Sequence, residues 1–254
     1  MKIYIRIITA LATSSALFTG NLGASDFKPP KLTDHALMLI ERTKLGPLDE
    51  RAEAIEECGV SRYIPCYYTL ISLLKDESPL IRRMSGLSLG LLRNPNAITY
   101  IDQALATEKD ESVKLYLLRS LGLFRTEKSL EMAEKFITDE SEKVRFEAAK
   151  VLNHMPANAQ YEKINTQIKN ESSDLVKVML ISAALKVKKT SDYITELVKY
   201  FYSTKRNVRL YAARTASDLQ MKETLLPLRK AIILEDDFEI RDELIQAYND
   251  TYHK

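Results

Sequence analysis

The chain repeats one short pattern at a nearly constant interval. An apolar residue followed directly by a basic residue recurs six times, in steps of 32, 31, 32, 32 and 32 residues. The six pairs are Ile81-Arg82, Val113-Lys114, Val144-Arg145, Val176-Lys177, Val208-Arg209 and Ile240-Arg241. We call the apolar member of each pair the anchor. Repeats of about 20 to 50 residues are typical of solenoids, in which each unit packs only on its neighbours.

Each repeat predicts two amphipathic helices. The residues four and eight after each anchor are mostly apolar or small, and these spacings share one face of a helix. All six residues that lie eight before the anchors are apolar or aromatic, which indicates a second buried helix face. Acidic and turn residues such as Asp139-Glu140-Ser141 separate the two helices and can cap free N–H groups. The sequence therefore predicts an all-α fold, a right-handed α-α superhelix of about six to seven hairpins with a period of 31–32 residues.

The details of the pattern resemble a known repeat. An acidic residue five before the anchor, the apolar-basic pair, and a closing Leu-Gly at Leu89-Gly90 and Leu121-Gly122 are similar to HEAT repeats. The short repeats of phycobilisome lyase subunits are of this type. The resemblance extends from about Asp49 to Tyr252, although the fifth and sixth units lack the Leu-Gly. It implies a helical solenoid and says little about function.

The resemblance also implies a role for the charged residues beside the anchors. In HEAT-like repeats, the corresponding acidic and basic residues bond between neighbouring units. We therefore expect a structural ladder, with a ligand-binding stripe as the alternative. Its expected members are Asp76, Arg82, Lys114, Asp139, Arg145, Lys177, Arg209 and Arg241. Further acids occupy the same position at Glu108, Glu171 and Glu235, whereas Ser203 breaks the pattern.

The N-terminal segment reads as an export signal. Residues 1–24 combine a basic start, an apolar run from Ile7 to Phe18 and small residues before a cut after Ala24. An uncleaved anchor is the alternative. Residues 25–32 form an expected linker containing Pro29-Pro30, and residues 33–254 form the repeat domain. We expect a periplasmic or secreted protein with no integral membrane span after cleavage.

Several boundaries follow from single residues. A first helix is expected from Thr33-Asp34 to about Lys44, and Gly59 is expected to stop the next helix. Pro227 is expected to kink its helix or delay its start. The last helix is expected to close the array with outward polar residues, namely Asp242, Glu243, Gln246, Asn249 and Asp250.

Charge and composition argue against several functions. The chain has 37 basic and 35 acidic residues, and Lys2 and Arg6 are the only charged residues of the first 24, so the remainder is balanced. A nucleic-acid binder needs a basic surface, so we expect none of that activity. The three histidines, His35, His154 and His253, show no metal-ligand spacing. We expect no catalytic residues, no cofactor and no metal, and hence no enzyme.

The only two cysteines are Cys58 and Cys66, and they flank the turn at residues 59–61. In an oxidising compartment they could form a disulfide, and otherwise they are two small buried residues. Sequence spacing does not decide between these interpretations, because it does not fix the distance between the two residues.

The favoured function is an exported, non-enzymatic scaffold or adaptor that binds a protein or peptide on its concave face. The residues three and six after the anchors point away from the buried face and include types that are common in interfaces. The candidate partner-binding residues are Tyr116, Arg119, Glu147, Lys150, Tyr211 and Arg214. The arginines favour a partner with acidic groups. The alternatives are a lyase-like or chaperone-type subunit, and an accessory subunit of a membrane-associated complex, which an apolar patch on the outer helices would favour.

Overall fold

A computed structural model describes residues 32–154 and 160–253. The predicted signal peptide and all but the last residue of the predicted linker lie outside the described residues. Nearly all described residues belong to one compact unit, His35–Lys254. Within the described ranges every regular element is a helix, which confirms the predicted all-α solenoid.

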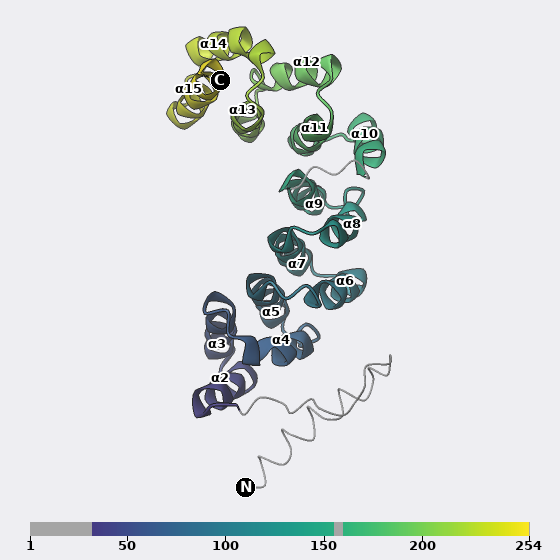
Figure 1. Cartoon of the computed structure of the whole chain (residues 1–254), viewed down its shortest axis with the longest axis vertical. Coiled ribbons are helices and arrows are strands. Elements are labelled where there is room, and N and C mark those ends of the chain that lie inside the picture. The colour runs from purple at the N-terminus through teal and green to yellow at the C-terminus, as the bar shows by residue number, and fades with distance from the viewer. Residues whose placement is uncertain (1–31, 155–159, 254) are drawn as a thin grey trace. The chain divides into compact units, whose positions relative to one another are not determined.

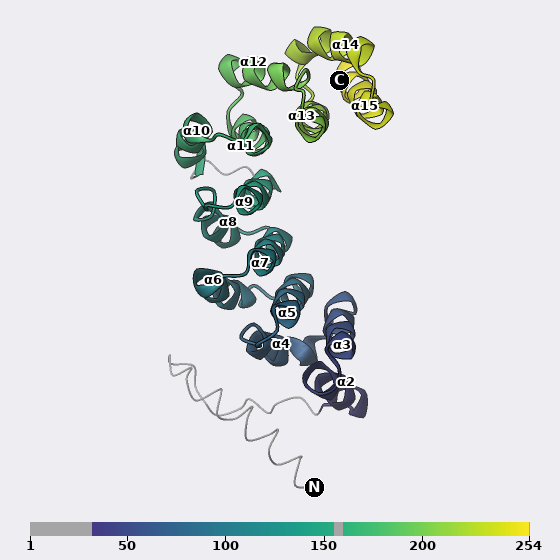
Figure 2. The same ribbon diagram turned by 180° about the vertical axis from the view of Figure 1, so that it is seen from behind.

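The helices alternate between two layers (Figures 1 and 2). One layer holds the helices that carry the anchors, together with the helix that precedes them, and we call it the anchored layer. It consists of α3 (Leu48–Val60), α5 (Pro79–Leu92), α7 (Glu111–Phe124), α9 (Glu142–His154), α11 (Asp174–Val187), α13 (Arg206–Leu219) and α15 (Phe238–Tyr252). Each of these helices packs against the next one in the series.

The second layer runs alongside the first. It consists of α4 (Tyr67–Leu73), α6 (Ala97–Thr107), α8 (Glu127–Glu134), α10 (Tyr161–Asn170), α12 (Ser191–Tyr200) and α14 (Leu225–Leu234). Each of these helices packs on the anchored helix that follows it, which forms six hairpins. Helix α2 (Asp34–Lys44) precedes them and ends where the sequence predicted. Together with α2–α3 this gives seven helical pairs, within the predicted range.

The core follows the repeat. All six anchors are buried, and so are the residues four positions after them. Side-chain caps begin several helices, because Asp110, Ser173 and Asp237 each accept a hydrogen bond from the backbone N–H three residues later. Pro79 occupies the first position of α5, where its missing N–H costs nothing.

Gly59 differs from the expectation that it ends its helix. Helix α3 continues to Val60, and the left-handed residue after it is Arg62, with φ of 50°. A Cβ at Gly59 would lie 2.7 Å from the backbone of Ser88. The Ser88 hydroxyl also donates to the carbonyl of Ile55 at 2.8 Å. Gly59 is therefore required for the close approach of α3 and α5 rather than for a turn.

After this contact, regular α-helix begins again only at Tyr67, following a 3-10 turn at Ile64–Cys66. At the C-terminal end, Pro227 lies in the first turn of α14, which is preceded by a 3-10 turn at Lys222–Thr224. The prediction that Pro227 delays the helix start is thus confirmed.

The expected polar surface of the last helix is only partly correct. Asp242, Gln246 and Asn249 are exposed. Two other members face α13, because Glu243 accepts hydrogen bonds from Arg214 and Asp250 accepts one from Ser217. These two carboxylates belong to the α13–α15 contact.

Candidate protein-binding surface

A run of aromatic and basic side chains lies along the anchored layer. It comprises Arg83, Tyr116, Arg119, Phe146, Lys150, Tyr211 and Arg214, and we call it the aromatic–basic stripe. Five of its members were predicted from the sequence. Arg83 and Phe146 were missed because they lie two residues after an anchor, a position that had been assigned to neither face.

Cation–π contacts join these side chains. The guanidinium groups of Arg83 and Arg119 both lie over the Tyr116 ring, at 5.4 and 5.1 Å from its centre. Lys150 lies over Phe146 and Arg214 over Tyr211, at 5.8 and 5.9 Å. Such contacts hold flexible basic side chains against rings, so the surface is already ordered before a partner binds.

Carboxylates within the chain also contact the stripe. Glu147 is buried and lies 3.3 Å from Arg119 and 3.2 Å from Lys150. Arg214 donates from Nε and Nη2 to one oxygen of Glu243, and these bonds raise the pKa of the arginine. The sequence predicted Glu147 as a partner-binding residue, but the structure places it beneath the two basic groups. These two carboxylates offset part of the positive charge of the four basic residues of the stripe.

One aromatic contact spans two repeats. The rings of Phe146 on α9 and Tyr211 on α13 meet edge to face at 5.1 Å, although α11 lies between these helices in the layer. Met179 of α11 is buried. Rings from alternate helices can touch only where the layer is concave, so this contact shows that the anchored layer curves inward locally.

The described surface also has a shallow hollow on α15. Phe238, Glu239, Asp242, Glu243 and Gln246 line it, and all five belong to this one helix. A single helix does not enclose a small ligand, whereas small-molecule sites are concave and bury most of their ligand. This hollow therefore extends the surface next to Arg214 and does not form a small-molecule pocket.

The basic residues beside the anchors form ion pairs between consecutive repeats, and we call this series the ion-pair ladder. Its five rungs are Arg51–Asp76, Arg82–Glu108, Lys114–Asp139, Arg145–Glu171 and Arg209–Glu235. In the three arginine–glutamate rungs, Nε and Nη2 each donate to a separate carboxylate oxygen at 2.7–3.0 Å. Such bidentate geometry fixes the position of one repeat on the next.

The acids of the ladder also cap the turn that follows them. Glu171 accepts hydrogen bonds from the backbone N–H groups of Ser172 and Ser173 as well as from Arg145. Burial alone would raise the pKa of Glu171, but these bonds outweigh burial and hold the pKa below its usual value. Glu108 and Glu235 have lowered pKa values for the same reasons. The rungs therefore carry charged carboxylates.

Two expected members of the ladder differ from the rest, and one member was missed. Among the described residues, no carboxylate pairs with Lys177, because Ser203 stands where the other repeats place an acid. Arg241 donates instead to the carbonyl of Glu235. Arg51 was missed because Glu50 precedes it, so the apolar-basic pattern is absent there.

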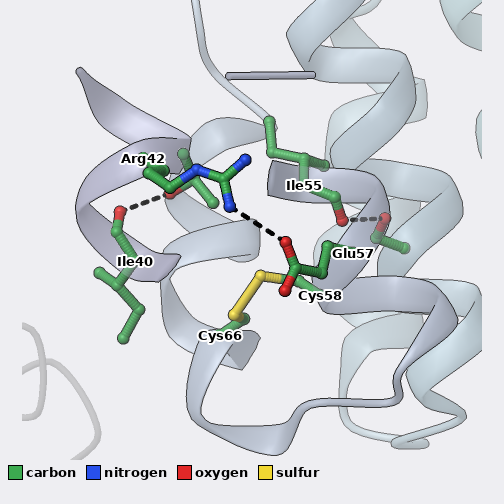
Figure 3. Close-up of a disulfide and its surroundings, with 8 residues drawn as sticks. Ile40, Arg42, Ile55, Glu57, Cys58 and Cys66 are labelled. Atoms are coloured by element: carbon green, nitrogen blue, oxygen red, sulfur yellow. Dashed lines mark hydrogen bonds and ion pairs between the residues drawn. A yellow bond between two sulfur atoms is a disulfide. The ribbon is translucent and has the colours of Figure 1, made fainter. Parts of the chain in front are cut away.

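Cys58 and Cys66 form a disulfide, with their Cα atoms 6.0 Å apart (Figure 3). It joins the end of α3 to the turn before α4. Beside it, Arg42 of α2 pairs with Glu57 of α3 at 3.1 Å. The first repeat is short and irregular, and these two links connect its parts.

His154 lies at the end of α9. Burial lowers its pKa, and the nearby positive charges of Arg125, Lys150 and Lys186 act in the same direction. Within residues 32–154 and 160–253, no cluster of three His, Cys, Asp or Glu side chains could hold a metal ion. In the same ranges, no helix combines the length and apolar character that crossing a membrane requires.

The comparisons with known proteins support the repeat class. Residues 101–183, about a third of the chain, match the family model of HEAT repeats. These residues are therefore similar to HEAT repeats, and the part of the chain that the structure describes has the fold of an α-solenoid. No curated protein sequence matches it.

Several solved structures share the fold. A chain of the complex of CpcE and CpcF of phycocyanin lyase from Nostoc sp. PCC7120 is 17% identical with a TM-score of 0.60, and the match covers 92% of this chain and 99% of that one. The Mot1 N-terminal domain, solved in complex with TBP, is 15% identical with a TM-score of 0.57, covering 97% of this chain and 38% of that one. YIBA of E. coli is 16% identical with a TM-score of 0.53, covering 86% and 93%. At these identities the likeness shows the fold alone.

Proposed function

We propose that this chain is a non-enzymatic scaffold that binds a protein or peptide along the aromatic–basic stripe. The observation that carries the proposal is the continuity of the stripe, which runs over α5, α7, α9 and α13. Tyrosine and arginine are the types that dominate binding energy in protein interfaces. A HEAT-repeat solenoid provides the extended surface that such binding uses.

The ion pairs of the stripe define the partner more closely. Arg119 and Arg214 are exposed at their outer edges although each has an internal carboxylate. Arg214 uses Nε and Nη2 for Glu243, which leaves the Nη1 donors for a partner. We infer a partner that covers the tyrosine rings and places acidic groups at these two arginines.

The test is a double substitution. Tyr116→Ala with Arg119→Ala removes one ring and its cation, and we expect at least tenfold weaker binding of the native partner recovered by co-purification, about 1.4 kcal/mol. The thermal midpoint should hardly change, because both side chains are partly exposed and Lys150 remains as a partner for the buried Glu147. The matched control is Tyr68→Ala with Lys135→Ala, which changes the same kinds of residue on the second layer. Equal affinity for the double variant and the wild type would contradict the proposed surface.

Export is part of the proposal. Residues 1–24 have the pattern of a signal peptide, and the Cys58–Cys66 disulfide supports an oxidising compartment. We expect N-terminal sequencing of the native protein to begin near Ser25, and fractionation to recover it from the periplasm or the medium. A chain that starts at Met1 and is recovered from the cytosol would contradict this part.

A further inference from the structure

Helix α14 exposes an unusual amount of apolar surface. Leu226, Ile233 and Leu234 are exposed at 63%, 74% and 69%, within a helix of ten residues. In both views α14 lies at the edge of the described chain, and α15 packs on it from one side (Figures 1 and 2). The side chain of Tyr202 is also exposed, and its hydroxyl donates to the carbonyl of Pro227 at 3.0 Å. This bond holds the ring beside α14, where it extends the apolar surface.

The exposed residues of α14 share one face. Leu226 and Ile233 are seven residues apart, about two helical turns, so they lie one above the other. Arg229 is exposed on one side of this pair, and Lys230 and Leu234 are exposed on the other. The buried residues of α14, Leu228 and Ala231, occupy the opposite side. The outward face therefore has Leu226 and Ile233 at its centre, a basic residue on each side of them, and Leu234 beyond Lys230.

This face carries only positive charge. Helix α14 contains no acidic residue. The carboxylate that follows it, Glu235, is buried and paired with Arg209 in the ladder. The nearest exposed acids along the sequence, Glu223 and Asp236, lie beyond the two ends of the helix. The sign of the face is thus fixed, although the charges of the whole chain nearly cancel.

We propose that α14 docks on the surface of a membrane that contains anionic phospholipids. An apolar helix face flanked by Lys and Arg is the pattern of helices that lie in the plane of a bilayer surface. Leu226, Ile233 and Leu234 enter the region between head groups and acyl chains, while Arg229 and Lys230 extend to the lipid phosphates. The binding is peripheral, and it is independent of the aromatic–basic stripe on the other layer.

The position of Lys230 favours lipid over a protein groove. It lies between Leu226 and Leu234 on the exposed face, so a protein covering both leucines would also have to bury the ammonium group. Lysine is depleted in the cores of protein interfaces for this reason. At a bilayer the same side chain reaches the phosphate layer without losing its hydration.

A local fluorescence probe tests the proposal in the full chain, because the sequence contains no tryptophan. The Ile233→Trp variant reports on α14, and the Val60→Trp variant is the matched control, since Val60 is exposed at 67% in the first repeat. Vesicles of phosphatidylglycerol and phosphatidylethanolamine with brominated acyl chains should shift the emission of the first variant to the blue and quench it. The control should not change.

Charge is tested on the same probe. Adding Arg229→Gln and Lys230→Gln to the Ile233→Trp variant should weaken binding to these vesicles by roughly 30-fold, given the attraction of each basic residue to an anionic surface. Phosphatidylcholine vesicles should bind weakly. Unchanged emission from Ile233→Trp, an equal change at Val60→Trp, or unchanged affinity after the two charge substitutions would each overturn the proposal. Capture of a protein partner at α14 without any vesicle response would do so as well.

Discussion

At the scale of single residues, Arg145 shows how one side chain joins three parts of the fold. Its guanidinium donates twice to Glu171 of the next repeat and once each to the carbonyl oxygens of Asp139 and Glu140. The side chain of Glu171 is only 1% exposed. The arginine therefore satisfies a buried charge in addition to holding a turn.

We expect Arg145→Ala to lower the free energy of unfolding by about 2–3 kcal/mol, because it leaves the buried Glu171 carboxylate without its charged partner. Urea unfolding followed by circular dichroism measures the change. Lys143→Ala is the matched control, since Lys143 is 73% exposed and pairs with Glu111 at the surface, where such pairs contribute little. Equal effects of the two substitutions would show that the ladder is no more than surface charge.

The ladder also predicts a pH dependence. Glu108, Glu171 and Glu235 have pKa values below the usual glutamate value. The unfolded chain therefore takes up protons first as pH falls, so the native state loses stability. The contribution is complete above about pH 4.3, the pKa of an unfolded glutamate, and is lost as pH falls through the lower native values.

We expect the urea concentration at the unfolding midpoint to stay level from pH 7 down to about pH 4.3 and to decrease between there and pH 3. Glu171→Gln should make this decrease less steep. A stability that stays level from pH 5 to pH 3 would contradict the description of these rungs as charged.

At the scale of elements, much of the architecture could be predicted from the sequence. The anchors are buried in every repeat, and buried positions can be recognised from their apolar residue types. The helix pairs and their buried faces were therefore predicted correctly. Gly59 was misread because a glycine near a helix end serves equally for a turn or for a close contact. Only the position of Ser88 on another helix distinguishes the two.

The candidate surface shows the same limit. Counting from the anchors predicts which residues point away from the buried face of each helix, and these include Tyr116, Arg119, Tyr211 and Arg214. Which of them touch could not be predicted, since the Phe146–Tyr211 contact joins residues from alternate helices. The burial of Glu147 likewise depends on how α7 approaches α9, and a repeat pattern does not contain that information.

The turn between α12 and α13, which contains Ser203, is where the ion-pair ladder is interrupted. Within the described part of the chain, Lys177 has no acid in the position that the other repeats provide. The Ser203 hydroxyl at that position accepts a turn-capping bond from the N–H of Lys205 at 3.2 Å. The ladder acids that lie 26 residues after their base are all glutamates, and Ser203 lies 26 after Lys177.

We therefore expect Ser203→Glu to complete this rung and to raise the free energy of unfolding by about 0.5–1 kcal/mol. The comparison is Ser203→Gln, which has the same size without the charge, and both are measured by urea unfolding at pH 7. If the two variants are equally stable, Lys177 does not pair with the new side chain.

At the scale of the whole molecule, the stability of a solenoid is approximately the sum of single repeats and of their contacts with neighbours. The five rungs, which join adjacent repeats, follow this rule. The first repeat has weak repeat character in its sequence, and the Cys58–Cys66 disulfide and the Arg42–Glu57 pair hold it together. The aromatic–basic stripe also depends on these contacts, because its residues come from several repeats and their relative positions are set by how the repeats stack.

The Phe146–Tyr211 contact gives this stack a mechanical property. Because the two rings skip α11, their separation changes whenever the angle between α9, α11 and α13 changes. An aromatic pair contributes about 0.5–1.5 kcal/mol, only one to three times the thermal energy. The contact between the rings is therefore weak enough to break and re-form as the anchored layer bends. A ligand that separated the two rings would therefore have to change the angles between these helices, and so the local curvature.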